Sequence, residues 1–183
     1  MSQSSSPQLT IRPATFPPDK ETVARLFLAY AQTLPISLAF QDFDAELAGL
    51  PGKYAAEVRG TVFLAGMAAS QPTIGCIAIR PFYHTKSATP STQTKVCELK
   101  CLYLTPSSRG RGVAKMLLSA AVQRARELGY EEMLFHTIAS MTAARRLYEG
   151  YGFEEIERYY ERIEGAVFYR LGKRKSRLIS FGV

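Results

Sequence analysis

The amino-acid sequence predicts a mixed α/β fold, in which a sheet of about seven strands is flanked by about four helices. Its 183 residues suffice for one domain, and fractions of 46% apolar and 21% charged residues are ordinary for a globular protein. The hydrophobic pattern switches along the chain between a period of about two residues, typical of strands, and about 3.6, typical of helices. No apolar run approaches the roughly 20 residues that span a bilayer. We therefore expect a soluble, folded domain.

The first 60 residues predict one strand and two helices. Residues 9–12 (LTIR) alternate apolar and polar side chains, as a half-buried strand does, and a proline ends the run. Residues 17–21 (PPDKE) place prolines and acids in a first helical turn, and apolar residues at helical spacing continue the helix until Pro35. A second, short helix is predicted over residues 43–47 (FDAEL), before a Leu-Pro-Gly stop.

The middle of the chain predicts three strands. Residues 61–68 (TVFLAGMA) and 73–80 (TIGCIAIR) are apolar and partly β-branched, and the short turn between them indicates a hairpin. Residues 95–105 (KVCELKCLYLT) predict the third strand. The polar loop over residues 82–94 is long enough to be a candidate substrate-side element.

The last third predicts two helices and three strands. Residues 107–114 (SSRGRGVA) form a basic turn that contains glycine, and an amphipathic helix follows over residues 115–128 until Gly129. The remaining elements are a strand at 132–138, a helix at 141–151 and a strand pair at 153–160 and 166–171.

Charge is concentrated at one end of the chain. The net charge is +7, and the stretch after residue 172 carries four cations and no acid. We expect residues 1–8 to form a disordered arm, residues 9–172 to form the domain, and residues 173–183 to form a basic tail. That tail is either solvated or a contact for nucleic acid or an anionic surface.

The cysteines indicate a reducing compartment. Cys76, Cys97 and Cys101 are an odd and sparse set, which is typical of reduced thiols, and the N-terminus lacks the pattern of a secretory signal, so we expect a cytoplasmic protein. Cys97 and Cys101 are about 13 Å apart along one predicted strand, too far for a disulfide. The two histidines, His84 and His136, are distant in sequence, and no metal site is predicted.

The turn at residues 107–112 predicts an anion site. A strand that leads into a glycine-bearing turn and then a helix presents unpaired backbone N–H groups where the helix dipole favours negative charge. Gly110 and Gly112 allow the backbone close approach to a phosphate or pyrophosphate, and Arg109 and Arg111 add charge. A Gly-x-Gly turn can also serve turn geometry alone, and the Walker and dinucleotide-binding patterns are incomplete here.

Two blocks of sequence carry a family pattern: CELKCLYLTPSSRGRGVAKMLL at residues 97–118 and ARRLYEGYGF at residues 144–153. They resemble the Gcn5-related N-acetyltransferase (GNAT) superfamily, with Arg/Gln-x-x-Gly-x-Gly/Ala after a strand and Ala-x-x-Leu-Tyr-x-x-x-Gly-Phe downstream. The FDAEL-AGLPG and CELK-LY runs resemble a branch of small, largely unassigned acetyltransferases. In this frame Ser107 replaces the first Arg or Gln, a lost pyrophosphate contact for which Arg109 and Arg111 would compensate.

The resemblance implies a mostly antiparallel, twisted sheet and acetyl-CoA as the acetyl donor. It implies that Leu102, Tyr103 and Leu104 line the pantetheine, partly through strand backbone groups. The turn and the helix start would hold the pyrophosphate. Those residues are Arg109, Gly110, Arg111, Gly112, Val113 and Ala114.

Two catalytic candidates follow from the resemblance. Tyr148 matches the family tyrosine that often protonates the leaving thiolate, and otherwise is a core aromatic. Glu98 lies on the strand where Gcn5-like members carry a catalytic glutamate, and is the base, an anchor for a cationic substrate, or a structural partner of a cation such as Lys100. His136 is either a proton relay or a structural strand residue. Strict alternation would place Glu98, Lys100, Leu102 and Leu104 on one face and Cys97, Leu99, Cys101 and Tyr103 on the other.

The expected activity is acetyl-CoA-dependent N-acetylation of a primary amine on a small molecule or amino-acid-like substrate, by direct attack of the amine on the thioester. One alternative is acetylation of a protein at a lysine or its N-terminus. Another is a non-catalytic CoA-binding sensor or interaction module. We expect neither a membrane nor a nucleic-acid partner, and a homodimer is compatible with the sequence.

Overall fold

The computed structural model describes residues 9–35, 43–67, 72–83, 94–159 and 164–172. They form one seven-stranded sheet of order β1-β2-β3-β4-β5-β7-β6, and every neighbouring pair is antiparallel except β4 and β5. This sheet confirms the predicted fold class. The strands are β1 (Thr10–Pro13), β2 (Thr61–Gly66), β3 (Thr73–Pro81), β4 (Val96–Leu104), β5 (Glu132–Ile138), β6 (Glu154–Ile156) and β7 (Ala166–Gly172).

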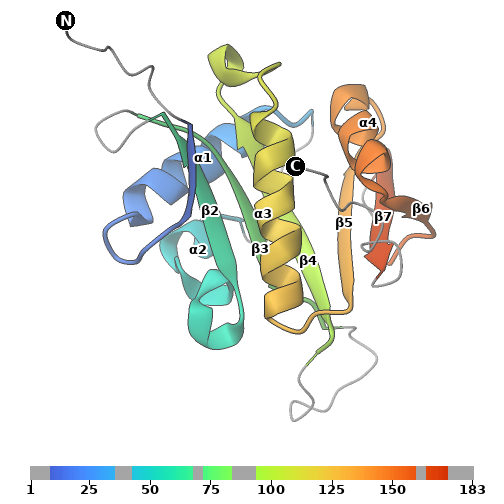
Figure 1. Ribbon diagram of the computed structural model, residues 1–183, viewed down its shortest axis with the longest axis horizontal. Coiled ribbons are helices and arrows are strands. Elements are labelled where there is room, and N and C mark those ends of the chain that lie inside the picture. The colour runs from blue at the N-terminus through green and yellow to red at the C-terminus, as the bar shows by residue number, and fades with distance from the viewer. Residues whose placement is uncertain (1–8, 36–42, 68–71, 84–93, 160–163, 173–183) are drawn as a thin grey trace, which may run out of the picture.

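Helices cover both faces of the sheet (Figure 1). The long helix α3 and the helix α4 cover one face, while α1 and α2 pack against the other. No helix among these residues is both long enough and apolar enough to cross a membrane. The α-helices are α1 (Lys20–Gln32), α2 (Phe43–Ala48), α3 (Val113–Glu127) and α4 (Thr142–Tyr151), and short 3-10 helices cover Gly52–Tyr54, Ala56–Val58 and Pro106–Ser108.

The element order agrees with the sequence prediction, although several boundaries differ. β1 includes Pro13, which β1 tolerates because it is an edge strand that pairs only with β2. The helix predicted from residue 115 begins at Val113, and the strand predicted at 153–160 covers only Glu154–Ile156. The predicted arm, the basic tail, His84 and most of the loop at 82–94 lie outside the described residues.

A bulge in β4 breaks the predicted alternation of its side chains. Opposite Ile77 of β3, β4 holds two residues, Cys101 and Leu102, and Cys101 has a left-handed φ of 53°. Cys101 therefore faces the same side as Lys100, and the faces predicted beyond Lys100 are wrong. Leu102 and Leu104 pack in the core under α3, whereas Cys101 and Tyr103 pack in the core under α1.

An ion pair connects β1 to the start of α1. Two guanidinium nitrogens of Arg12 donate to the Asp19 carboxylate at 2.7 and 2.8 Å, and the backbone N–H of Thr15 donates to the same carboxylate at 2.7 Å. The hydrogen bonds from Arg12 hold the pKa of Asp19 well below its ordinary value, although burial opposes the shift. Asp19 therefore stabilises the fold as an anion.

The Asp19→Asn change is expected to lower the free energy of unfolding by about 1 kcal/mol at pH 7, because the guanidinium is half exposed. A carboxyl with a lowered pKa stabilises the fold above its unfolded pKa of about 3.9 and loses that effect as the pH falls. Urea unfolding of both proteins at pH 7 and pH 3 measures the difference, which should shrink at pH 3. A difference independent of pH would contradict the role of the charge.

Candidate active site

The cleft of the molecule opens where β4 and β5 separate. The two parallel strands pair only between Val96–Glu98 and residues 132–134, and then diverge toward their carboxyl ends, as Figure 1 shows. A cavity of about 620 Å³ lies there, lined by the second halves of both strands, the end of α1, the turn before α3 and the first turns of α4. Ligands of α/β sheets commonly bind at such strand ends. A larger cavity of about 890 Å³, between the β1–α1 segment and α3, contains none of the candidate residues.

The turn before α3 has the features of an anion cradle. Gly110 and Gly112 have φ of 75° and 76°, which glycine adopts without strain, and a Cβ added at either would meet nothing within 4 Å. No side chain caps the start of α3, so its first backbone N–H groups are available to a ligand. Arg109 donates from Nε to the carbonyl of Leu104 at 3.3 Å, which ties the turn to the end of β4.

The structure corrects the frame in which the family pattern was placed on this turn. Arg109, Gly112 and Ala114 also satisfy Arg/Gln-x-x-Gly-x-Gly/Ala. α3 begins at Val113, directly after Gly112, so this second frame coincides with the helix start. Ser107 instead lies in the short 3-10 helix before the turn. In this frame the first position holds an arginine, and the Ser107 departure disappears.

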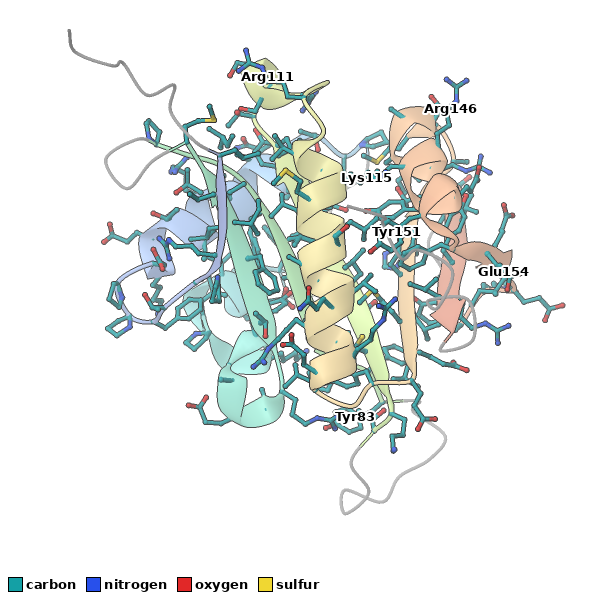
Figure 2. The ribbon with its side chains drawn as sticks, in the orientation of Figure 1. Tyr83, Arg111, Lys115, Arg146, Tyr151 and Glu154 are labelled. Carbon is teal, nitrogen blue, oxygen red and sulfur yellow. The ribbon has the colours of Figure 1, made fainter. Side chains whose placement is uncertain are left out.

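Cationic side chains gather at the same end of the molecule. Figure 2 places Arg111 in the turn, Lys115 near the start of α3 and Arg146 on α4, all at the end where β4 and β5 separate. These charges add to the helix dipole, so this end of the cleft favours a polyanion.

The strand residues predicted to line the pantetheine divide between two faces. Leu102 and Leu104 line the cavity, whereas Tyr103 does not line it and packs in the core under α1. Within the described residues, the backbone of β4 beyond Glu98 has no strand partner on its β5 side. That edge can hydrogen-bond an extended ligand as an added strand would.

Tyr148 lies in α4 and lines the cavity. Its ring packs on Phe135 with centroids 4.0 Å apart and against the edge of Phe153. Burial raises the pKa of the Tyr148 hydroxyl far above its ordinary value, with further contributions from Tyr30 and Cys101. The hydroxyl is therefore protonated at neutral pH and can only donate a proton.

Glu98 lies fully buried in β4, in a chain of charged groups. Arg80 of β3 donates to its Oε2 from Nε at 3.0 Å and from a terminal nitrogen at 2.8 Å. The other terminal nitrogen of Arg80 donates to Glu46 of α2 at 2.7 Å, and the Tyr54 hydroxyl donates to Glu46 at 2.6 Å. Burial alone would raise the pKa of Glu98, but the charges of Lys100 and Arg80 outweigh it and lower that pKa.

His136 of β5 lines the cavity beside this chain. Its Nδ1 lies 3.9 Å from Oε1 of Glu98, and its ring lies 5.7 Å from that of Phe168. Burial and the charge of Lys100 lower the pKa of His136 to about 4, against the opposing effect of Glu98. The imidazole is therefore neutral at pH 7.

Sequence reasoning missed Arg80 and Tyr30. Arg80 is the one charged residue of β3, and it is 8% exposed, so its charge in a mostly apolar run was a signal of a buried partner. Tyr30 lies at the end of the apolar face of α1 and reaches the cavity. In the sequence, Tyr30 has the helical spacing of a core residue, so its position at the cavity could not be predicted.

Cysteines and metal-binding groups contribute no further site in the part of the chain that the structure describes. Cys76, Cys97 and Cys101 are buried and make no disulfide. No three His, Cys, Asp or Glu side chains among the described residues are close enough to hold a metal ion.

Known proteins share this fold and sequence pattern. The profile of the acetyltransferase (GNAT) family matches residues 26–153. An uncharacterized N-acetyltransferase of Schizosaccharomyces pombe is 31% identical over 164 residues, which cover 89% of this chain and 94% of the relative. One of Dictyostelium discoideum is 25% identical over 190 residues, covering 76% and 87%.

Solved structures agree with the fold. A GNAT-family acetyltransferase from Staphylococcus aureus matches with a TM-score of 0.71 at 18% identity, over 90% of this chain and 99% of its own. A GNAT phosphinothricin acetyltransferase from Sinorhizobium meliloti, in complex with acetyl-CoA, matches with a TM-score of 0.67 at 20% identity, over 90% and 88%.

The separated strands, the cradle at the start of α3 and the matching family profile together define an acyltransferase. The chain belongs to the GNAT family of acetyltransferases.

Proposed function

We propose that this protein transfers the acetyl group of acetyl-CoA to a primary amine of a small molecule or amino-acid-like compound. The observation that carries the proposal is the continuity of one cleft, from the anion cradle at Gly110 to the buried hydroxyl of Tyr148. Acetyl-CoA supplies a pyrophosphate for the cradle, an extended arm for the free edge of β4, and an acetyl thioester.

The residues of the cradle fit this donor. Arg109, Gly110 and the unpaired N–H groups at the start of α3 can bind a pyrophosphate, since two φ-positive glycines leave the space above them open. Leu102 and Leu104 offer an apolar wall to the arm that follows. Tyr103 contributes its backbone only, because its side chain packs under α1.

The chemical step needs a proton removed from the amine and one supplied to the sulfur. We assign the second task to Tyr148, whose hydroxyl stays protonated at neutral pH. Glu98 lies near the cleft as an anion, and Arg80 donates a hydrogen bond to one of its carboxylate oxygens.

The cavity of about 620 Å³ is in the range of small-molecule sites, and the donor would occupy part of it. Tyr30, Thr33 and Leu34 at the end of α1 form a wall of this cavity on the side where an acceptor would approach β4. Protein acetylation and a non-catalytic CoA sensor are the alternatives that the experiment separates.

The test is a screen of thiol release from acetyl-CoA with spermidine, free amino acids, glucosamine and a lysine-containing peptide as acceptors. We expect turnover with at least one small amine and none with the peptide. Turnover with the peptide alone would favour a protein acetyltransferase. Tight acetyl-CoA binding by calorimetry without turnover would favour the sensor.

A further inference from the structure

Three polar side chains near the cavity are candidates to accept the proton that the attacking amine loses. Glu98, His136 and Lys100 all project from β4 or β5 on the α1 side of the sheet. Of these, His136 and Lys100 line the cavity, and Glu98 does not. The ammonium group of Lys100 offers hydrogen-bond donors and no acceptor.

Glu98 is poorly suited to accept the proton itself. Its side chain is 1% exposed, behind the residues that form the cavity wall. Its Oε2 accepts two hydrogen bonds from Arg80, so the lone pairs of that oxygen are already engaged. A carboxylate stabilised as an anion in this way is better suited to position a neighbouring base than to accept the proton itself.

The unused oxygen of Glu98 points to that neighbour. Oε1 is buried and has no hydrogen-bond partner among the described residues. The Nδ1 atom of His136 lies 3.9 Å from it, and such catalytic contacts are often long without substrate and shorten when it binds. A carboxylate at Nδ1 keeps the proton on that nitrogen and leaves Nε2, across the ring, with a lone pair.

We propose that His136 takes the proton of the attacking amine at Nε2, directly or through one water, and that Glu98 is a positioning residue that holds the imidazole at Nδ1. This inference rests on the proposed acetyl transfer. The amine nitrogen forms a bond to the acetyl carbon as the carbon–sulfur bond breaks. The bonding electrons go to sulfur, which gains a proton from Tyr148, and the amine proton passes to His136.

The charges around His136 are consistent with this role. Burial of the ring, together with the charges of Lys100 on β4 and Arg80 on β3, lowers the pKa of His136 and keeps the ring neutral at pH 7, whereas Glu98 favours the imidazolium that forms when the proton arrives. On the β7 side the neighbour is the uncharged ring of Phe168, which packs against Tyr159. A neutral base beside a carboxylate can accept a proton and release it in each cycle.

The first test needs no substrate. Nitrogen-15 NMR of the imidazoles at pH 7 should show His136 neutral, with the proton on Nδ1, and His136→Gln assigns its signals against those of His84. In Glu98→Gln the preference for Nδ1–H should weaken. An imidazolium at pH 7, a proton on Nε2, or an unchanged tautomer in Glu98→Gln would overturn the proposal.

The second test is kinetic, with the fastest small amine among spermidine, the amino acids and glucosamine. His136→Gln should lower kcat by about 10²–10³-fold and remove the acidic limb of its pH profile, with acetyl-CoA affinity kept. Glu98→Gln should cost about 10–100-fold, in the range of residues that orient a functional histidine, and move the limb to lower pH, because Glu98 raises the pKa of the ring. Glu131→Gln, at an exposed ion pair with Lys95, is the matched control.

The double variant Glu98→Gln/His136→Gln shows whether Glu98 acts through His136 or independently of it. If Glu98 acts through His136, Glu98→Gln combined with His136→Gln should be no slower than His136→Gln alone. Additive losses, or wild-type kcat in His136→Gln, would overturn the proposal while the acetyl transfer itself stands. Absence of turnover in the wild-type protein would instead refute the proposed function, and the NMR measurement would still test the contact between Glu98 and His136.

Discussion

Gly112→Asp is expected to abolish acetyl-CoA binding. Gly112 precedes the first residue of α3 with φ of 76°, and a Cβ there would meet nothing within 4 Å, so a side chain would project into the space that we propose for the pyrophosphate. An aspartate adds a negative charge to the site and strain to the backbone. Calorimetry should show the affinity for acetyl-CoA falling at least 100-fold, which is a loss of about 2.7 kcal/mol of binding free energy.

The strain of a side chain at positive φ must be separated from the loss of the site. Gly129 provides that control, since it follows the other end of α3 with φ of 79° and also has nothing within 4 Å. Gly129→Asp should lower stability by a similar amount and keep acetyl-CoA affinity. Unchanged affinity in a folded Gly112→Asp protein would show that the donor binds elsewhere.

The cradle could be predicted because it is local. A strand end, two glycines and a helix start within about ten residues determine which N–H groups are unpaired, and no distant contact is needed to see them. The spacing of the hydrophobic residues also predicted the order of strands and helices, and the structure confirms that order. The frame of the family pattern on this turn was a local error, which the start of α3 at Val113 corrects.

The bulge at Cys101 could not be predicted in the same way. Period-two counting assumes that every residue of β4 pairs with one of β3, and the run CELKCLYL contains neither glycine nor proline to signal an exception. The extra residue reverses the facing of Leu102 and Tyr103. Of these two side chains, that of Leu102 lines the cleft.

The environment of Glu98 was equally hidden, because it depends on contacts across the sequence. Arg80 is 18 residues away, and Glu46 is 34 residues from Arg80 on a different layer. Sequence reasoning left base, anchor and structural partner open, with Lys100 named as the cation. The partner that holds the carboxylate is Arg80, and this pairing changes the carboxylate from a candidate base to a fixed charge next to His136.

The second large effect is expected for Tyr148→Phe, which removes one hydroxyl and keeps the ring. The aromatic packing with Phe135 and Phe153 should survive, so fold and acetyl-CoA affinity should be retained. Loss of a general acid costs on the order of 10²–10⁴ in rate, and we expect kcat to fall by about 10²–10³-fold. Burial keeps the pKa of this hydroxyl far above neutral, so Tyr148 should contribute no limb to the pH profile between pH 6 and about pH 9.

Tyr151→Phe is the matched control, because Tyr151 is also buried on α4, packs against Phe153 and is absent from the cavity wall. Its position relative to α4 can be followed in Figure 2. The Tyr151→Phe variant should keep kcat within about twofold of wild type, since a hydroxyl outside the cleft cannot donate its proton to the leaving thiolate. The readout is thiol release under single turnover, where the chemical step is isolated. Equal single-turnover rates for Tyr148→Phe and wild type would show that the thiolate departs without this residue, and would leave proton removal at His136 as the only acid–base step that the cleft supplies.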